Sequence, residues 1–163
     1  GFEINLLGPS SKASLLAWVK GEDALPVTKL SLTNGAAMRI APVGCLIEAG
    51  EHEKIAEASR KAITGAGLNL YLKSGFSNTV TVFEVPEETT AAAILDGVKK
   101  DYNIMLAGSF DVLAGKVIRI GHMGNNADFY NVREVFAALD GTLAKLGVPL
   151  KASMEKIFCD NMK

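Results

Sequence analysis

The spacing of the strand-like runs in the second half of the chain is the feature that most constrains its fold. β-Branched and aromatic residues dominate residues 78–85, and two shorter apolar runs follow at residues 104–107 and 116–120. Only a short glycine-containing loop separates the last two runs, which leaves no room for the helical crossover that parallel strands need. The spacing therefore predicts a small, mostly antiparallel sheet.

Three segments around these runs have the apolar periodicity of amphipathic helices. The first covers residues 51–64, and the second runs from a threonine cap at position 89 or 90 to about residue 102. The third begins at the cap Asp128 and is stopped by Gly147. Its inward stripe consists of Val132, Val135, Phe136, Leu139, Leu143 and Leu146. The order of helices and strands predicts an α+β fold with helices packed on one face of the sheet.

The sequence pattern of the first fifty residues differs from that of the rest of the chain. We therefore expect two parts: an N-terminal segment at 1–50, whose origin is undetermined, and a domain at 51–163 that contains the helices and strands above. Ser10 and Ser11 offer N-caps for a helix that Gly21 ends. Residues 36–48 fit either a buried helix interrupted by a proline or a pair of strands.

Composition and charge exclude several classes of function. The net charge is −1 and Lys and Arg are interspersed with acids, which argues against nucleic-acid binding. No apolar run approaches the roughly 20 residues of a membrane span. Cys45 and Cys159 lie far apart without a partner motif, and no secretory signal is visible, so we expect a cytoplasmic protein. The two histidines and two cysteines lack metal-ligand spacing, and we expect no metal.

Residues 116–124, Lys-Val-Ile-Arg-Ile-Gly-His-Met-Gly, carry a family resemblance. This stretch resembles the small C-terminal domain of class V PLP-dependent aminotransferases, which include alanine–glyoxylate and serine–pyruvate aminotransferases. The similarity extends over residues 51–149, through ordered motifs at 77–81, 85–87, 101–104 and 130–145.

The resemblance implies one functional residue, Arg119, which would bind the α-carboxylate of a small amino or keto acid. A guanidinium suits this role because it presents two parallel donors to a carboxylate and stays charged. The alternative from the residues alone is an arginine in an edge-strand salt bridge. His122 is expected to be a packed or hydrogen-bonded side chain.

In this family the cofactor PLP is held by a large domain that supplies a lysine, an acid and a phosphate cup. The fifty residues before the matched part are too few for such a doubly wound domain. Lys12 is expected to be a solvated helix residue. We therefore assign no catalytic residue, and we expect that this chain alone does not bind PLP and is inactive as an aminotransferase.

A second, shorter resemblance covers residues 15–48, centred on 33–44, and points to ADP-ribosylglycohydrolases. That family holds magnesium through acidic motifs absent here, so no metal ligand is transferred. Two alternatives to the aminotransferase reading stay open: a non-catalytic, recombined or engineered domain that self-associates, and a fragment of an ADP-ribosyl hydrolase. The initial Gly in place of Met suggests a processed or excised product. A solitary small domain should expose an apolar face, so we expect a homo-oligomer.

Overall fold

A computed structural model describes residues 16–17, 19–23 and 49–163, and the chain divides into two units, Gly1–Glu48 and Ala49–Lys163. In the described part of the first unit, residues 16, 17 and 19 are helical and are followed by a turn in which Gly21 has a φ of +73°. This agrees with the expected helix end at Gly21. The remaining expectations for residues 1–48, including the caps at positions 10 and 11 and the ambiguous segment 36–48, lie outside the described residues.

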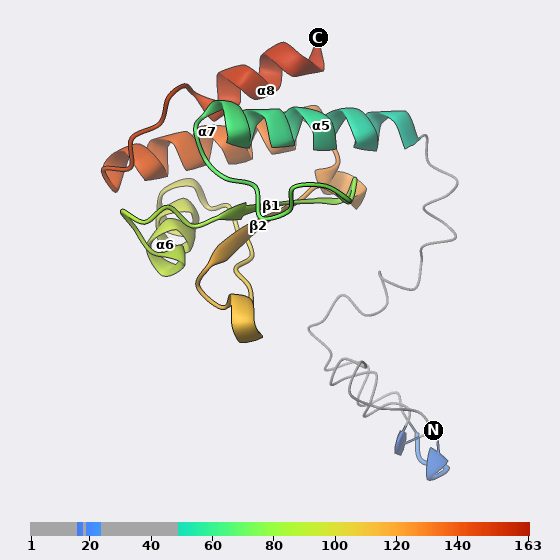
Figure 1. The fold of residues 1–163 in the computed structure, drawn as a ribbon. Helices are drawn as coiled ribbons and strands as arrows, with labels where there is room; N and C mark the ends of the chain where they lie inside the picture. Colours follow the sequence, from blue (N-terminus) through green and yellow to red (C-terminus); the bar gives the residue numbers. More distant parts are fainter. Residues whose placement is uncertain (1–15, 18, 24–48) are drawn as a thin grey trace. The chain divides into compact units, whose positions relative to one another are not determined.

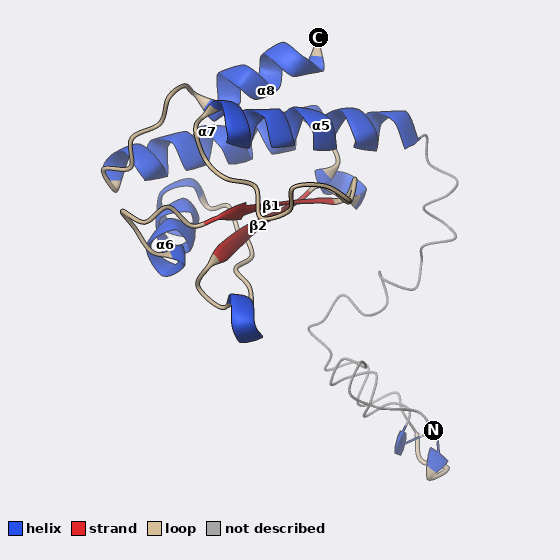
Figure 2. Ribbon diagram, viewed as in Figure 1, coloured by secondary structure: helices blue, strands red, loops and turns tan. Residues whose placement is uncertain are grey.

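The second unit consists of four α-helices, two strands and two short 3-10 helices (Figures 1 and 2). In chain order these are α5 (Ala49–Gly65), β1 (Val80–Glu84), α6 (Ala91–Tyr102), η2 (Asp111–Leu113), β2 (Val117–Gly121), η3 (Gly124–Asn126), α7 (Phe129–Lys145) and α8 (Met154–Met162). The fold is α+β with a small antiparallel sheet, as the sequence predicted. The sequence did not predict α8.

The register of β1 and β2 separates a buried face of the sheet from an open one. The strands are antiparallel, and the pairs Thr81–Ile120 and Phe83–Ile118 place four buried side chains on the same face. Successive side chains along a strand point to opposite faces. Arg119, between the two isoleucines, therefore points away from the core.

Two isolated bridges extend the sheet at its edges. Leu70 bridges to Phe83 on the outer side of β1, and Ala107 bridges to Arg119 on the outer side of β2. The strand expected at residues 104–107 is reduced to this single bridge.

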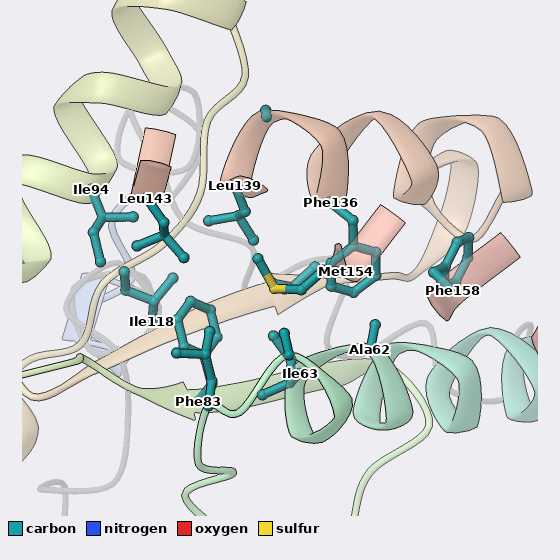
Figure 3. Close-up of a cluster of buried hydrophobic side chains, with 14 of the residues drawn as sticks. Ala62, Ile63, Phe83, Ile94, Ile118, Phe136, Leu139, Leu143, Met154 and Phe158 are labelled. Atoms are coloured by element: carbon teal, nitrogen blue, oxygen red, sulfur yellow. The ribbon is translucent and has the colours of Figure 1, made fainter. Parts of the chain in front are cut away.

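The core lies between the buried face of the sheet and the helices. Helices α5 and α7 both pack against α8, α6 packs against α7, and α5 contacts β1. Figure 1 shows α5, α7 and α8 on the same side of the two strands. The side chains that meet in the core are drawn in Figure 3 and include Ala62, Ile63, Phe83, Ile94, Ile118, Phe136, Leu139, Leu143, Met154 and Phe158.

Helix α7 begins at the residue that the sequence indicated. The Asp128 carboxylate accepts hydrogen bonds from the backbone N–H groups of Tyr130 and Asn131, at 2.9 and 3.2 Å. These bonds satisfy donors that an α-helix leaves unpaired in its first turn. The C-terminal end of α7 differs from the expectation that Leu146 belongs to its inward stripe. Leu146 follows the last helical residue and is exposed, and the left-handed turn at Gly147 comes next.

Helix α8 is fixed to α7 through its N-terminus. The Asp140 carboxylate of α7 accepts the Ser153 hydroxyl at 2.7 Å and the backbone N–H groups of Met154 and Glu155 at 2.9 and 3.1 Å. A carboxylate at this position also suits the positive end of the helix dipole. One side chain thus orients the helix whose Met154 and Phe158 complete the core.

Candidate functional site

Arg119 lies on the open face of the sheet, and three residues of the segment 107–110 contact it. Its Nε–H donates to the carbonyl of Gly108 at 2.7 Å. Its guanidinium carbon lies 5.9 Å from the centre of the Phe110 ring. The backbone of Arg119 exchanges hydrogen bonds with Ala107, at 2.8 and 3.4 Å. The loop therefore holds both the main chain and the side chain of this arginine.

The remaining donors of Arg119 are unused within the described residues. An arginine has five N–H donors, and the bond to Gly108 uses only the one on Nε. No ion pair among the described residues involves Arg119. The alternative that Arg119 forms a salt bridge on an edge strand is therefore not supported by any acidic partner in this part of the chain. The two terminal nitrogens form a fork that matches a carboxylate. This is the geometry that carboxylate binding needs, and the role itself stays a prediction.

The surface of the second unit carries exposed apolar side chains in the segment that leads to Arg119. Met105, Phe110 and Val112 are 79%, 75% and 73% exposed. Large apolar side chains exposed in the same short segment often mark a surface that another molecule covers. The expectation of a homo-oligomer stays a prediction.

His122 follows the arginine strand and is fully buried. Its Nδ1 lies 3.2 Å from the carbonyl oxygen of Asn78, and its Nε2 lies 2.9 Å from the hydroxyl of Thr81. A carbonyl only accepts, so Nδ1 carries the proton and Nε2 accepts from Thr81. Burial lowers the pKa of His122, which favours this neutral form. Both ring nitrogens are occupied, so His122 is the packed, hydrogen-bonded side chain that the sequence predicted.

The described residues do not fit a PLP site of their own. Such a site needs a sheltered lysine to carry the cofactor and a partner for the pyridine nitrogen. Every lysine in residues 19–23 and 49–163 is exposed. Lys61, Lys145 and Lys163 form surface ion pairs with Glu57, Asp101 and Asp160. Lys12 lies outside the described residues, and the expectation that this chain alone does not bind PLP stays a prediction.

No group of three or more His, Cys, Asp or Glu side chains in the described part is arranged to hold a metal ion. None of the described helices is long and apolar enough to cross a bilayer.

Sequence reasoning missed the two contacts of Arg119, Gly108 and Phe110. The signal available in the sequence is an aromatic residue inside a glycine-containing loop directly before the arginine strand. An aromatic side chain at such a position has no place in the alternating core pattern, which suggests a partner outside the core.

The chain is similar in sequence to known aminotransferases. No family model matches it. It is 35% identical over 103 residues to an uncharacterized aminotransferase of Methanocaldococcus jannaschii, covering 63% of this chain and 26% of the relative. It is 37% identical over 91 residues to a serine–glyoxylate aminotransferase of Methylorubrum extorquens, covering 51% of this chain and 23% of the relative. The chain spans about a quarter of the length of these relatives.

The fold is also similar to that of a solved aminotransferase structure. The crystal structure of ureidoglycine–glyoxylate aminotransferase from Bacillus subtilis superposes with a TM-score of 0.65 at 26% identity, over 85% of this chain and 34% of that one. Sequence and structure together support a class V aminotransferase C-terminal segment. The resemblance to ADP-ribosylglycohydrolases is not shown by the comparisons, and residues 33–44 lie outside the described part.

Proposed function

We propose that this aminotransferase-like domain recognises the α-carboxylate of a small amino acid or 2-oxo acid, and that Arg119 binds it. The observation that carries the proposal is the orientation of the guanidinium, whose Nε is held by Gly108 and whose terminal nitrogens have no partner among the described residues. A carboxylate placed against this fork receives two parallel charge-assisted hydrogen bonds. Two of the named proteins are glyoxylate aminotransferases, so glyoxylate and pyruvate are the first 2-oxo acids to test.

We propose that this domain serves transamination. The reaction is carried out by a whole protein that contains such a segment. Bound PLP supplies the electron sink that allows an amino group to move between carbon skeletons. Arg119 contributes the placement of the substrate, because fixing the carboxylate fixes the distance of the α-carbon from the cofactor. We propose that the described residues supply this recognition and that the cofactor is held by other residues, since each described lysine is exposed.

Direct binding tests the role of Arg119. Glyoxylate, pyruvate and L-serine are titrated into the purified chain, and the dissociation constant is measured by NMR. Arg119→Gln removes the charge and the fork, and we expect binding to fall by about ten- to a hundredfold, as for hydrogen bonds to a charged group. Arg119→Lys keeps the charge without the fork and should bind at an intermediate level. Arg133→Gln is the matched control, because Arg133 pairs with Glu155 on the helical surface.

The same titration can refute the proposal. If the Arg119→Gln variant binds as tightly as the wild type, the carboxylate role is wrong. If the chain mixed with PLP shows a visible-range cofactor band and transaminates, the assignment of the cofactor to other residues is wrong.

A second candidate is a non-catalytic domain that self-associates. The exposure of Met105, Phe110 and Val112 favours it, because an isolated chain would leave these side chains in water. Light scattering after size exclusion distinguishes the two candidates: a concentration-dependent dimer without carboxylate binding supports self-association, and a monomer at high concentration contradicts it.

A further inference from the structure

The loop before β2 contacts Arg119 in a way that core packing does not explain. Phe110 is 75% exposed and stands outside the hydrophobic core, yet its ring lies over the guanidinium. The next residue, Asp111, has a φ of +56°, a left-handed conformation that is uncommon for a residue other than glycine. A backbone held in this conformation next to a candidate site suggests a functional constraint.

The Gly108 carbonyl and the Phe110 ring restrict different motions of the guanidinium. The carbonyl accepts the Nε–H at 2.7 Å and fixes the edge of the guanidinium plane. The ring lies 5.9 Å from the guanidinium carbon, within the range of cation–π attraction, and covers one face. Phe110 has no hydrogen-bond acceptor, so it orients Arg119 without consuming a donor. An acidic residue in its place would occupy the fork that a substrate needs.

We propose that Phe110 is a positioning residue for the carboxylate site, and this rests on the proposed function of Arg119. With one edge held by Gly108 and one face covered by Phe110, the terminal nitrogens are left for a ligand. A carboxylate then approaches in the guanidinium plane, which is the geometry of a bidentate pair. The ring also excludes water from one face of the cation, which strengthens the interaction with an anionic ligand.

Four variants distinguish the effect of the aromatic ring of Phe110 from the effect of the size of its side chain. Phe110→Ala removes the ring, Phe110→Leu keeps an apolar side chain without a π system, and Phe110→Tyr keeps the ring. Val112→Ala is the matched control, because Val112 is a similarly exposed apolar residue of the same loop. Phe110 contributes little to the core, so we expect all four variants to keep the wild-type far-UV circular dichroism.

Two measurements are made on each variant of the 163-residue chain: the dissociation constant for pyruvate, and the solvent exchange of the Arg119 Nε–H proton by NMR. For Phe110→Ala we expect binding weaker by about two- to fivefold and faster exchange of this proton, as for the loss of an exposed cation–π contact. Phe110→Tyr should behave as wild type, whereas Phe110→Leu should behave as Phe110→Ala. Val112→Ala should change neither quantity.

The outcomes distinguish this inference from the proposed function. If the wild type binds pyruvate, Arg119→Gln does not, and Phe110→Ala matches the wild type in both measurements, only the positioning role is wrong. Full restoration by Phe110→Leu would also overturn it. If wild-type protein fails to bind pyruvate, glyoxylate and L-serine, or if Arg119→Gln binds them equally well, the proposed function fails and this inference fails with it.

Discussion

Gly97 lies in the middle of α6, at the point where α6 approaches α7, and its replacement by alanine tests that approach. By helix propensity alone, Gly97→Ala should stabilise the protein by about 1 kcal/mol. The structure reverses this expectation, because a Cβ atom at position 97 would lie 2.7 Å from the Cγ2 methyl of Thr142. Thr142 is buried, so its methyl has little room to move. Overpacking of this kind costs roughly 1–3 kcal/mol, and we expect Gly97→Ala to lower the free energy of unfolding by about 1 kcal/mol.

Substitutions at Thr142 show whether the methyl group is the cause. Thr142→Ser removes Cγ2 and keeps the hydroxyl, so in that background Gly97→Ala should recover its propensity and stabilise by about 0.5–1 kcal/mol. Thr142→Val keeps a methyl at the contact, so Gly97→Ala should remain destabilising there. The double-mutant cycle of Gly97→Ala with Thr142→Ser should therefore give a coupling energy of about 1–3 kcal/mol. The cycle of Gly97→Ala with Thr142→Val should give a coupling energy near zero. The Thr142 hydroxyl is buried and has no hydrogen-bond partner among the described residues, so Thr142→Val alone should not destabilise through a lost hydrogen bond.

Urea unfolding followed by far-UV circular dichroism measures these free energies, and the slope against urea should stay constant across the set. A higher free energy of unfolding for Gly97→Ala in the wild-type background would contradict a close approach of α6 to α7. The absence of coupling between Gly97→Ala and Thr142→Ser would contradict it as well. Either result would mean that α6 and α7 are farther apart than the structure places them.

Two further predictions concern polar side chains that support the fold. Burial lowers the pKa of His122 in the folded state below its ordinary value of 6.5, so the unfolded chain binds more protons and stability falls as the pH drops below about 6.5. His122→Gln should flatten this dependence between pH 5 and 8, whereas His52→Gln should keep it, and parallel curves for the wild type and His122→Gln would contradict the assignment. Asp140→Ala removes the acceptor of three hydrogen bonds at the start of α8 and should lower the free energy of unfolding by about 1–2 kcal/mol. Urea unfolding of Asp140→Ala beside Asp96→Ala, an exposed helical aspartate, checks this, and equal stabilities would argue against the capping role.

The features predicted from the sequence are those with local causes. Thr90 caps α6 by accepting the N–H of Ala93 at 3.2 Å, and Asp128 caps α7, because a cap acts within the first turn of its own helix. The alternation along β2 placed Arg119 between two apolar residues, which is enough to put it on a different face from the core.

The features missed depend on partners that are distant in the sequence. Helix α8 has only nine residues, too few to be stable alone, and it depends on α5, α7 and the Asp140 carboxylate. The segment at 104–107 has strand composition but finds a partner on one side only. Phe110 and Arg119 are nine positions apart in the chain, and Asp111 beside Phe110 has a left-handed conformation that no nearest-neighbour pattern indicates.

The alternation along β2 gives neighbouring positions separate evolutionary constraints. Ile118 and Ile120 are buried in the hydrophobic core, whereas Arg119 between them is half-buried on the opposite face of the sheet. A substitution at position 119 changes what the open face attracts and leaves both isoleucines in place, and repacking of the isoleucines leaves the cation where it stands. In a strand built in this way, substitutions at position 119 can change ligand preference without lowering the thermodynamic stability of the domain. Ligand preference can therefore diverge among descendants independently of stability.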